Sequence, residues 1–572
     1  LRKSSGTNAA NFVFDAYGNI NDSAAITASS GKINLTLQSD YNNDGMGGVY
    51  IGGTVTTNGG NITIGGGSGT ITAGSGYATA YSNRGFGVGI YNSINAGGGN
   101  IIINGHGSSN ASDVTSNDGV DIGGAITTSG SGAINITGIG GPAENSGSGN
   151  GTGTIGVNVI SNISTVNGTL NITGTGGGAG FNGGNVGVQI SGSPTIQSTG
   201  SGNITITGTG GNNNGSGNDG IAVYSSDGSV VKTTSSGSII LYGVKGGTAV
   251  NSYGIYADSS NAFKTTGSGN ITAYTDTLYL GGASAFNSAG SLTIAPYSNI
   301  GMSLGTSVAN TLNFSDAQLG DLTAASFIFG SRTTGTGAAN TSLLTIGTNY
   351  DFGFHNVSLI SGGDINVAHS LVVIIGGGTS WLLQADGNIY NSNNASLSQS
   401  SYNTVNITLD SGHSGGGGTT TWNGGSIDTG GGTLTFTHNL VIGSSGTTFD
   451  TTDTYDSITA GTATFGGTVN GSGNLTLNAA TVNFGGAWGG TTPLGTVGIH
   501  AASNLSLPSI SASTIQVETA NAGFGNITIN SGSVLTASGS GNAVFLATPG
   551  NFTNNSGSGA IALTGSGRWL VA

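Results

Sequence analysis

Two short motifs carry oxygen-bearing side chains that could bind a cation. The segment Asp40-Tyr41-Asn42-Asn43-Asp44-Gly45 places oxygen ligands at alternate positions, as calcium-binding loops do. Such a loop closes with a bidentate carboxylate, and Ile51 occupies that position here. We therefore predict a structural Asx turn at 40–45. The Gly-rich segment 215–220 also resembles a calcium-binding repeat, but it occurs once, whereas those sites need consecutive turns.

The tripeptide Gly105-His106-Gly107 points to a different chemistry, because it also occurs in β-helical polygalacturonases. Acid–base hydrolysis of a glycoside needs two carboxyl groups that face each other across the bond. No Asp-Asp pair occurs in this chain, and Glu occurs only at Glu144 and Glu518. We predict that His106 is a solvated loop residue and that the chain is not an enzyme.

The remaining ionisable residues are dispersed along the sequence. The densest acidic cluster is Asp450, Asp453 and Asp456, and strand alternation places residues with this spacing on no single face. We predict a solvated loop there, with weak attraction of cations as the alternative. The other histidines are too far apart for a catalytic triad or a metal cluster. They are His355, His369, His413, His438 and His500.

We predict no catalytic, cofactor-binding or metal site. The longest N-terminal connector nevertheless carries Tyr77, Tyr81, Arg84 and Phe86. Because loops on the surface often carry binding residues, these side chains are candidates for contact with sugar or protein.

Composition limits the elements that can position these residues. Gly fills 113 of 572 positions, and charged residues make up 6% of the chain against about 25% in a typical soluble domain. The residues that favour helices are too scattered for long helices. The net charge of −14, with only nine Lys and Arg, makes nucleic acid a poor partner. Without Cys, neither disulfides nor Cys-built metal sites can form.

Hydrophobic alternation predicts strands. Composition alone would permit a disordered polymer rich in Gly, Ser and Asn. However, β-branched and polar residues alternate in many short segments, which is the pattern of half-buried strands between glycine turns. Examples are the segments 33–37, 62–64, 204–206, 475–477 and 527–529.

The strands recur with a period. The segments 48–57 and 119–128 read Gly-Val-Tyr-Ile-Gly-Gly-Thr-Val-Thr-Thr and Gly-Val-Asp-Ile-Gly-Gly-Ala-Ile-Thr-Thr. The same opening recurs at spacings of 39, 32, 37, 31, 33 and 34 residues, and periods of about 20–50 residues mark solenoids or arrays. Its first apolar residues are Val49, Val88, Val120, Val157, Val188, Ile221 and Ile255.

Each repeat contains three short apolar segments and one connector of variable length. We predict coils with three sides that stack at the ~4.8 Å strand spacing and bury continuous apolar ladders. The expected inward residues include Val49, Ile51, Ile62, Ile64, Val120, Ile122, Ile134, Ile136, Ile204 and Ile206. The connectors should emerge along one side and be dispensable for folding. They are 65–87, 104–119, 137–156, 173–187, 207–220 and 242–254.

The predicted fold is an all-β, right-handed parallel β-helix (β-solenoid) with three short strands per coil and variable loops. Residues 1–48 form the first coils or an entry segment, and 49–280 form regular repeats of about 34 residues. Residues 281–572 form more divergent coils of the same continuous solenoid. No apolar run is long enough to span a membrane.

The repeats resemble those of filamentous-haemagglutinin-type large exoproteins, which are adhesins of the two-partner secretion family. The N-terminal resemblance rests on Leu-Gln-Ser-Asp-Tyr-Asn-Asn-Asp-Gly at 37–45 and on 52–67. At the C-terminal end it rests on 507–510, 515–517, 525–529, 550–552 and 565–571. It covers most of the chain as low-complexity repeats, although the family's N-terminal secretion domain is not evident. We expect an interior or processed piece of a larger protein.

The resemblance implies a secreted or cell-surface structural and adhesive rod, an adhesin stalk or surface fibre without catalytic activity. Its implied partners are an outer-membrane partner transporter during export and a glycan or protein on a host or neighbouring cell surface. Self-association is a further expectation, because uncapped coils expose strand edges. One alternative is a β-helical polysaccharide-degrading enzyme, which two carboxylates within about 10 Å on one face would favour. A second is a self-assembling extracellular filament subunit.

Overall fold

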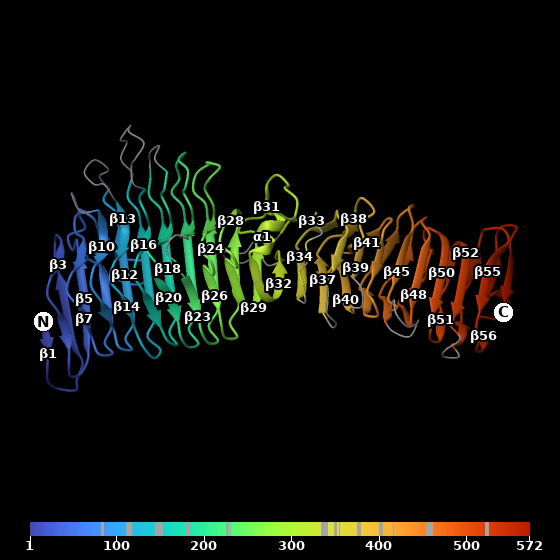
Figure 1. Ribbon diagram of the computed structural model, residues 1–572, viewed down its shortest axis with the longest axis horizontal. Helices are drawn as coiled ribbons and strands as arrows, with labels where there is room; N and C mark the ends of the chain where they lie inside the picture. Colours follow the sequence, from blue (N-terminus) through green and yellow to red (C-terminus); the bar gives the residue numbers. More distant parts are fainter. Residues whose placement is uncertain are drawn as a thin grey trace. The chain divides into compact units, whose positions relative to one another are not determined.

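The computed structural model describes residues 1–572 except 82–84, 110–116, 143–152, 179–182, 225–227, 229, 333–340, 348–349, 351, 354, 374–378, 400–403, 416, 454–460 and 521–524. The described residues form short strands, with one helix, α1 (Asp316–Gly320), and one 3-10 turn, η4 (Gly557–Gly559). Named strands in the described residues pair in parallel, and the two antiparallel contacts are isolated bridges. The predicted fold class, an all-β parallel β-helix, is confirmed (Figure 1).

The chain divides into two compact units, and unit 1 comprises Leu1–Ser298 and Gly320–Ala325. Its strands form three faces, one strand per coil on each. Face 1 consists of β3 (Ile20–Asp22), β6 (Val49–Ile51), β10 (Phe86–Ile90), β13 (Asp118–Ile122), β16 (Val157–Val159), β19 (Val188–Ile190), β22 (Ile221–Val223), β25 (Ile255–Ala257) and β28 (Leu278–Leu280).

Faces 2 and 3 lie on the other two sides of the same coils. Face 2 consists of β1 (Arg2–Lys3), β4 (Ile26–Ala28), β7 (Val55–Thr56), β11 (Ile94–Asn95), β14 (Ile126–Thr127), β17 (Ile163–Thr165), β20 (Thr195–Ser198), β23 (Val230–Thr233) and β26 (Phe263–Thr265). Face 3 consists of β2 (Ala10–Asp15), β5 (Ile33–Ser39), β8 (Ile62–Gly66), β12 (Ile101–His106), β15 (Ile134–Ile139), β18 (Leu170–Thr175), β21 (Ile204–Thr209), β24 (Ile239–Val244) and β27 (Ile271–Thr275). The strand β29 (Phe286–Ala295) pairs with both β26 and β27, and β9 (Ala78–Thr79) pairs with β12.

Aliphatic ladders form the core of unit 1. On face 1, Val88 pairs with Val49 in one neighbouring coil and with Val120 in the other. The same register continues through Val157, Val188, Ile221, Ile255 and Leu278. All ten inward residues predicted from the repeat are at most 1% exposed. The predicted repeat register and its buried positions are therefore confirmed.

The strands of face 3 are longer than the sequence pattern predicted. They continue into residues assigned above to the connectors, where Thr137 and Gly138 still pair with Thr173 and Gly174. Apolar alternation ends before these residues, so the hydrophobic pattern could not reveal them. The connectors all join face 3 of one coil to face 1 of the next. Their described parts accordingly leave the strands along one edge of unit 1 (Figure 1).

Paired glycines let face 3 approach the start of face 1 closely. A Cβ atom on Gly138 would lie 1.9 Å from the carbonyl oxygen of Gly156, and one on Gly174 would lie 2.0 Å from that of Gly187. Neither Gly138 nor Gly174 has a positive φ, so lack of space requires glycine there. The same close approach recurs at Gly105, Gly208 and Gly243.

Buried polar side chains link the ends of the connectors. The Oδ1 atom of Asn185 accepts hydrogen bonds from N and Oγ1 of Thr154, both at 2.9 Å. Its Nδ2 donates to Oδ1 of Asn218 at 3.0 Å, and the backbone N–H of Asn218 donates to Oγ of Ser252 at 3.1 Å. These residues belong to successive coils, so the connector ends form a hydrogen-bonded row beside the core.

Unit 2 comprises Asn299–Leu319 and Ser326–Ala572. Its first sheet runs β31 (Thr311–Phe314), β30 (Gly301–Leu304), β33 (Leu343–Ile346), β35 (Asp364–Val367), β38 (Ile389–Asn391), β41 (Thr419–Trp422), β44 (Asn439–Ile442) and β47 (Val469–Asn470). A second set runs β32 (Leu322–Phe329), β34 (Asn356–Ser361), β37 (Thr379–Ala385), β40 (Val405–Ser411), β43 (Thr433–Phe436), β46 (Thr462–Phe465) and β49 (Thr481–Phe484).

The remaining strands of unit 2 form two further sheets. The larger runs β36 (Leu371–Val373), β39 (Leu397–Gln399), β42 (Ser426–Asp428), β45 (Thr447–Asp450), β48 (Leu475–Ala479), β50 (Leu494–Ala501), β52 (Ile510–Thr519), β54 (Leu535–Ala537) and β57 (Ile561–Leu563), with β55 (Asn542–Ala547) and β58 (Arg568–Val571) continuing from β52. The smaller contains β51 (Leu505–Leu507), β53 (Ile527–Ile529) and β56 (Phe552–Asn554).

Aromatic rings replace much of the aliphatic core in unit 2. Phe436 and Phe465 pair between β43 and β46, with ring centroids 5.5 Å apart and an interplanar angle of 16°. Trp422 and Trp488 are fully buried, and the indole Nε1 of each has no hydrogen-bond partner among the described residues. These two rings therefore contribute to the core as apolar volume.

Candidate functional site

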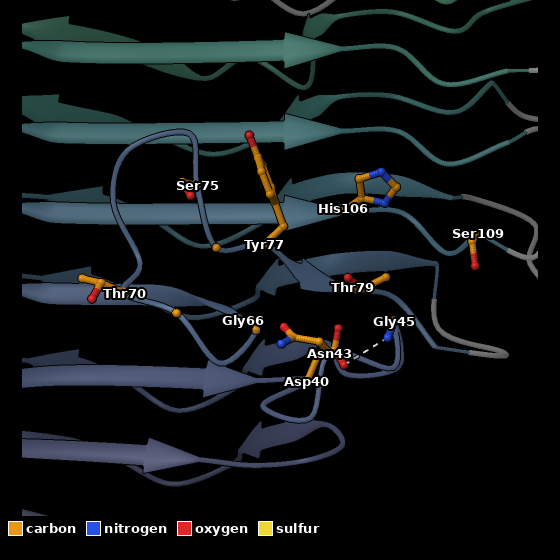
Figure 2. A pocket seen from close by; sticks show the side chains of 13 residues that line it. Asp40, Asn43, Gly45, Gly66, Thr70, Ser75, Tyr77, Thr79, His106 and Ser109 are labelled. Carbon is orange, nitrogen blue, oxygen red and sulfur yellow. Dashed lines mark hydrogen bonds between the residues drawn. The ribbon is translucent and has the colours of Figure 1, made fainter.

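A polar hollow of about 540 Å³ lies beside the first coils of unit 1 (Figure 2). Asp40 follows β5, Tyr77 precedes β9, and His106 ends β12. The rings of Tyr77 and His106 meet edge to face, with centroids 6.5 Å apart. Among the described lining residues Asp40 is the one carboxylate, so the hollow lacks the facing pair that glycoside hydrolysis requires.

The Asp40 segment forms the predicted turn. Oδ1 of Asp44 accepts a hydrogen bond from the backbone N–H of Met46 at 3.0 Å, which is the Asx-turn pattern. Oδ1 of Asp40 accepts from the N–H of Gly45 at 3.1 Å. Burial, and after it the neighbouring Asp44, raises the pKa of Asp40. The carboxylates therefore serve the turn, as the structural interpretation predicted.

The prediction for His106 is wrong. His106 is the last residue of β12, pairs with Ile139 of β15 and is half-buried. Its Nδ1 donates to the carbonyl oxygen of Gly107 at 2.5 Å. The loop assignment failed because the ladder of backbone hydrogen bonds continues past the last apolar residue of that strand.

Residues of the second calcium-like segment, 215–220, bond to neighbouring coils. Asn218 takes part in the buried row of connector ends. Oδ1 of Asp219 accepts a hydrogen bond from the backbone N–H of Tyr253 at 2.6 Å. Asp219 is only 3% exposed, and this burial raises its pKa to about 6. Because the buried carboxylate of Asp219 accepts a hydrogen bond from the next coil, its role is structural.

A row of polar side chains runs along the outside of face 1. The register aligns Asp121, Asn158 and Gln189 on β13, β16 and β19. Nδ2 of Asn158 donates to Oδ1 of Asp121 at 2.9 Å, and Nε2 of Gln189 donates to Oδ1 of Asn158 at 3.3 Å. Tyr91, 46% exposed, lies near one end of this row. We name Asp121, Asn158 and Gln189 the face-1 polar row.

Four tyrosines continue the outer surface of face 1, and we name them the tyrosine strip: Tyr224, Tyr253, Tyr256 and Tyr279. Tyr256 pairs with Tyr279 in register, and their rings stack at 4.7 Å with an interplanar angle of 7°. Tyr224 and Tyr253 lie 5.6 and 5.9 Å from Tyr256. Burial raises the pKa of both Tyr224 and Tyr256 to about 12, so their hydroxyl groups stay protonated above the pH at which an exposed tyrosine ionises. Alternation in the sequence did not reveal this strip, because its members lie in three different coils.

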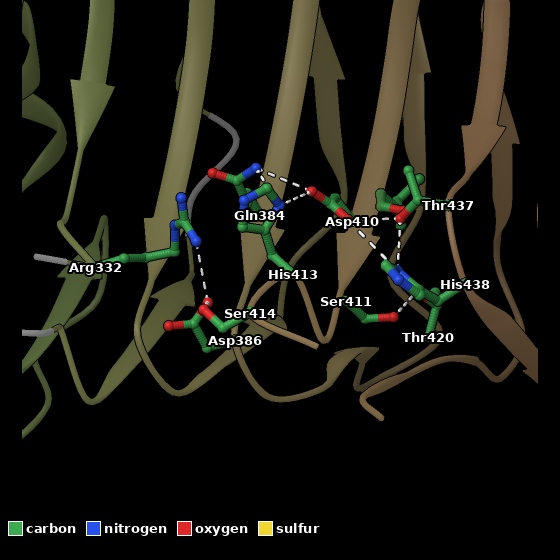
Figure 3. Close-up of polar contacts among 11 residues, drawn as sticks. Arg332, Gln384, Asp386, Asp410, Ser411, His413, Ser414, Thr420, Thr437 and His438 are labelled. Atoms are coloured by element: carbon green, nitrogen blue, oxygen red, sulfur yellow. Dashed lines mark hydrogen bonds and ion pairs between the residues drawn. The ribbon is translucent and has the colours of Figure 1, made fainter. Parts of the chain in front are cut away.

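Unit 2 brings two histidines to one carboxylate (Figure 3). Nδ1 of His413 lies 2.5 Å from Oδ2 of Asp410, and Nδ1 of His438 lies 3.5 Å from Oδ1. Thr437 Oγ1 and Gln384 Nε2 also donate to this carboxylate, at 2.7 and 2.9 Å. Burial raises the pKa of Asp410, but the hydrogen bonds from Thr437, Gln384 and His413 outweigh it and lower the pKa overall. His413 and His438, which lie 25 residues apart in sequence, thus meet at one carboxylate, a contact that their spacing did not reveal.

The Asp410 cluster contains two parts of a catalytic triad. A carboxylate bonded to Nδ1 of a histidine leaves Nε2 to accept a proton from a nucleophile. No described hydroxyl group donates to Nε2 of His413. The nearby Ser414 donates instead to Oδ1 of Asp386 at 2.6 Å, and Arg332 forms an ion pair with the same carboxylate at 3.1 Å. The described arrangement can order the ends of β37, β40 and β43, but it has no nucleophile in place.

The structure at Asp450 differs from the predicted solvated loop. Asp450 is the last residue of β45 and pairs with Asp428 of β42, so it is a strand residue. Its Oδ1 accepts from N and Oγ1 of Thr452 at 2.9 and 2.6 Å, and its Oδ2 accepts from Nδ2 of Asn478 at 3.0 Å. Asp456 lies outside the described residues. The loop prediction failed because cross-coil pairing extends β45 to Asp450.

The other candidates lie apart from one another. Phe86 packs against Tyr50 and Tyr91, at 5.8 and 5.7 Å, whereas Tyr77 lines the hollow. Tyr81 is 45% exposed, and Arg84 lies outside the described residues. Among the remaining histidines, His355 packs edge-on against Phe327, His369 contacts the carbonyl oxygen of Ser370, and His500 pairs with Glu518 at 3.5 Å. Within the described residues, no group of three His, Asp or Glu side chains is arranged to hold a metal ion.

Comparison of this chain with protein-family models, curated proteins and solved structures gives no match. In the described part of the chain, none of the helices has the length and apolarity needed to cross a bilayer.

Proposed function

We propose that this chain is a structural and adhesive segment of a bacterial cell-surface or secreted protein, without catalytic activity. The proposal combines the β-helix with the resemblance to filamentous-haemagglutinin-type exoproteins. On that resemblance, an outer-membrane partner transporter exports the chain, and its target is a glycan or protein on a host or neighbouring cell. The location is extracellular.

The observation that carries the proposal is the outer surface of face 1. The half-buried side chains of Asn158 and Gln189 lie there in register on successive coils, beside the buried carboxylate of Asp121, and the tyrosine strip follows. Each contact with such a row is weak, but rows repeated at ~4.8 Å on a stacked sheet can engage an extended partner at several points. Tyrosine adds contact area at low conformational cost.

Adhesion by the full chain tests this proposal. The immobilised protein should retain cells or glycan-coated beads, and Asn158→Ala/Gln189→Ala should reduce retention at least severalfold. The matched control is Asn135→Ala/Asn171→Ala, because Nδ2 of Asn171 donates to Oδ1 of Asn135 in the same way on face 3, at 2.8 Å. Equal loss in both variants, or retention unchanged in the first, would contradict the assignment to face 1.

One observation favours a polysaccharide-degrading enzyme as the second candidate. Asp428 and Asp450 pair across adjacent coils, which puts their backbones about 4.8 Å apart on one face. Glycoside hydrolysis needs two carboxyl groups about 5 to 10 Å apart, and neighbouring positions on one face can provide such a pair. Against this, both oxygens of Asp450 already accept hydrogen bonds from Thr452 and Asn478. Release of sugar ends from pectin-like or other polysaccharides that is lost in Asp450→Asn would replace the adhesive proposal with this one.

A further inference from the structure

Two lysines occupy neighbouring positions on face 2 of unit 1. Lys232 on β23 and Lys264 on β26 pair in register and are both half-buried. Neither forms an ion pair with any described residue. Like charges placed directly opposite each other in a sheet are destabilising. An acidic partner that covers this pair would relieve the repulsion.

The same coils carry an acidic and aromatic surface on face 1. Asp258 follows β25 and is half-buried. A Cβ atom on Gly281 would lie 2.2 Å from Oδ1 of Asp258 and 2.8 Å from Cε1 of Tyr279, so this carboxylate lies beside the tyrosine strip. Lys245, in the connector after β24, is the other basic residue of this segment and forms no ion pair with a described residue. The strip therefore combines a carboxylate with four tyrosine rings, to which ammonium groups are attracted.

We propose that unit 1 packs side by side with a second copy of this chain, with Lys232 and Lys264 of one copy against Asp258 and the tyrosine strip of the other. The two surfaces occupy the same coils, so copies aligned at the same level along the coils bring them together. The contact joins face 2 to face 1, and each copy therefore keeps one surface free for a further copy. This inference does not depend on the proposed adhesive function.

The size of the faces sets the strength of this association. Nine strands at ~4.8 Å spacing and about 10 Å of strand length give each face an area of roughly 400 Å². The two faces together bury about 800 Å², which is below the roughly 1,200 Å² of a stable interface and in the range of weak, transient contacts. The association should therefore be weak and depend on protein concentration.

Sedimentation equilibrium of the full chain tests the proposal. Wild-type protein between about 1 and 100 µM should show a weight-average mass that rises with concentration. Lys232→Glu/Lys264→Glu should weaken association at least about tenfold, since the attraction of two ammonium groups to the Asp258 carboxylate and the tyrosine rings is replaced by repulsion. The control Lys32→Glu/Lys245→Glu changes the net charge equally, from −14 to −18, and should associate like wild type.

Exchanging the charges of face 1 and face 2 identifies the faces that contact each other. Asp258→Lys alone should also lose association, because its face 1 then repels the native lysines of face 2. Mixing Asp258→Lys with Lys232→Glu/Lys264→Glu should restore it, because an altered face 1 then meets an altered face 2. Hydrogen exchange of each variant, matching wild type in the core amides, establishes that the fold is retained.

Three results would overturn the proposal. One is a wild-type mass that stays at 55.4 kDa over the whole concentration range. The second is association of Lys232→Glu/Lys264→Glu at wild-type strength. The third is a mixture of the two variants that remains monomeric. If the wild-type protein self-associates but retains no cells in the separate retention assay, only the proposed adhesive function is contradicted.

Discussion

Replacing Asn185 by Ala should destabilise unit 1 even though Asn185 lies in a connector. The substitution removes at least three side-chain hydrogen bonds, two from Thr154 and one to Asn218. Asn185 is fully buried, so the groups left behind cannot bond to bulk water. At about 0.5–1.5 kcal/mol for each bond, the local free energy of unfolding should fall by about 2–4 kcal/mol.

Hydrogen–deuterium exchange can measure this effect where it occurs. The backbone N–H groups of Gly156 and Gly187 donate to Val186 and Asp219 in neighbouring coils, both at 2.9 Å. A loss of 2–4 kcal/mol corresponds to exchange roughly 30- to 1,000-fold faster at these amides. Asn214→Ala is the matched control, because Asn214 is exposed and makes no hydrogen bond with a described residue. It should change exchange less than about twofold, within the ±0.5 kcal/mol typical of surface substitutions.

The outcome decides whether the connector ends belong to the fold. Exchange within tenfold of wild type at Gly156 and Gly187, or equal acceleration by Asn214→Ala, would refute the reasoning from the buried row. It would also restore the simpler expectation that whole connectors are dispensable. If the reasoning holds, a connector can be shortened only in the part that precedes its buried polar residue.

Three further predictions concern the core, pH and activity. Ile204→Ala should lower the free energy of unfolding in urea by about 2–5 kcal/mol, because Ile204 is 0% exposed. Thr205→Ala, on the outer side of the same strand, should change this free energy by less than about 0.5 kcal/mol. Equal effects of the two substitutions would refute the inward assignment of Ile204. The pKa of Asp219 in the folded state, about 6, lies above its ordinary value of 3.8, so its contribution to stability is complete below pH 4 and is lost as the pH rises through 6. Between pH 4 and 7, the wild-type protein should therefore lose about 2–2.5 kcal/mol more of its free energy of unfolding in urea than Asp219→Asn does, and equal losses would contradict the burial argument. The purified chain should release no reducing or unsaturated ends from polysaccharides, and sustained release would contradict this if it disappears on substitution of Asp40, His106 or Asp453.

The strand pattern was predictable from the sequence because it depends on local chemistry. Residues such as Val49 and Val120 are β-branched, alternate with polar neighbours and return at one-coil spacings, and each of these properties can be counted along the chain. Stacking follows, because a single coil has too few apolar residues to bury itself. The Asx turn at Asp44 was predictable for the same reason, since its hydrogen bond to Met46 spans only two residues.

The candidate sites were less predictable than the strand pattern, because they depend on which residues of neighbouring coils contact one another. His413 and His438 both reach Asp410 from successive coils, although 25 residues separate the two histidines in sequence. His106 lies in a strand because its backbone pairs with that of Ile139. Connector lengths vary from coil to coil, so the spacing between contacting residues varies as well. No fixed sequence interval reveals such pairs.

The sequence by itself determined the element type, the three-sided coil and the inward ladder of unit 1, since alternation, glycine turns and repeat length are properties of the chain. The tertiary structure alone decided the outer surfaces. Tyr256 and Tyr279 stack, Lys232 faces Lys264 and Asn185 bonds to Asn218 only because parallel register places equivalent positions one above another. Each inward residue can be recognised by its own apolarity, whereas the chemistry of an outward row depends on which residues of neighbouring coils lie beside one another.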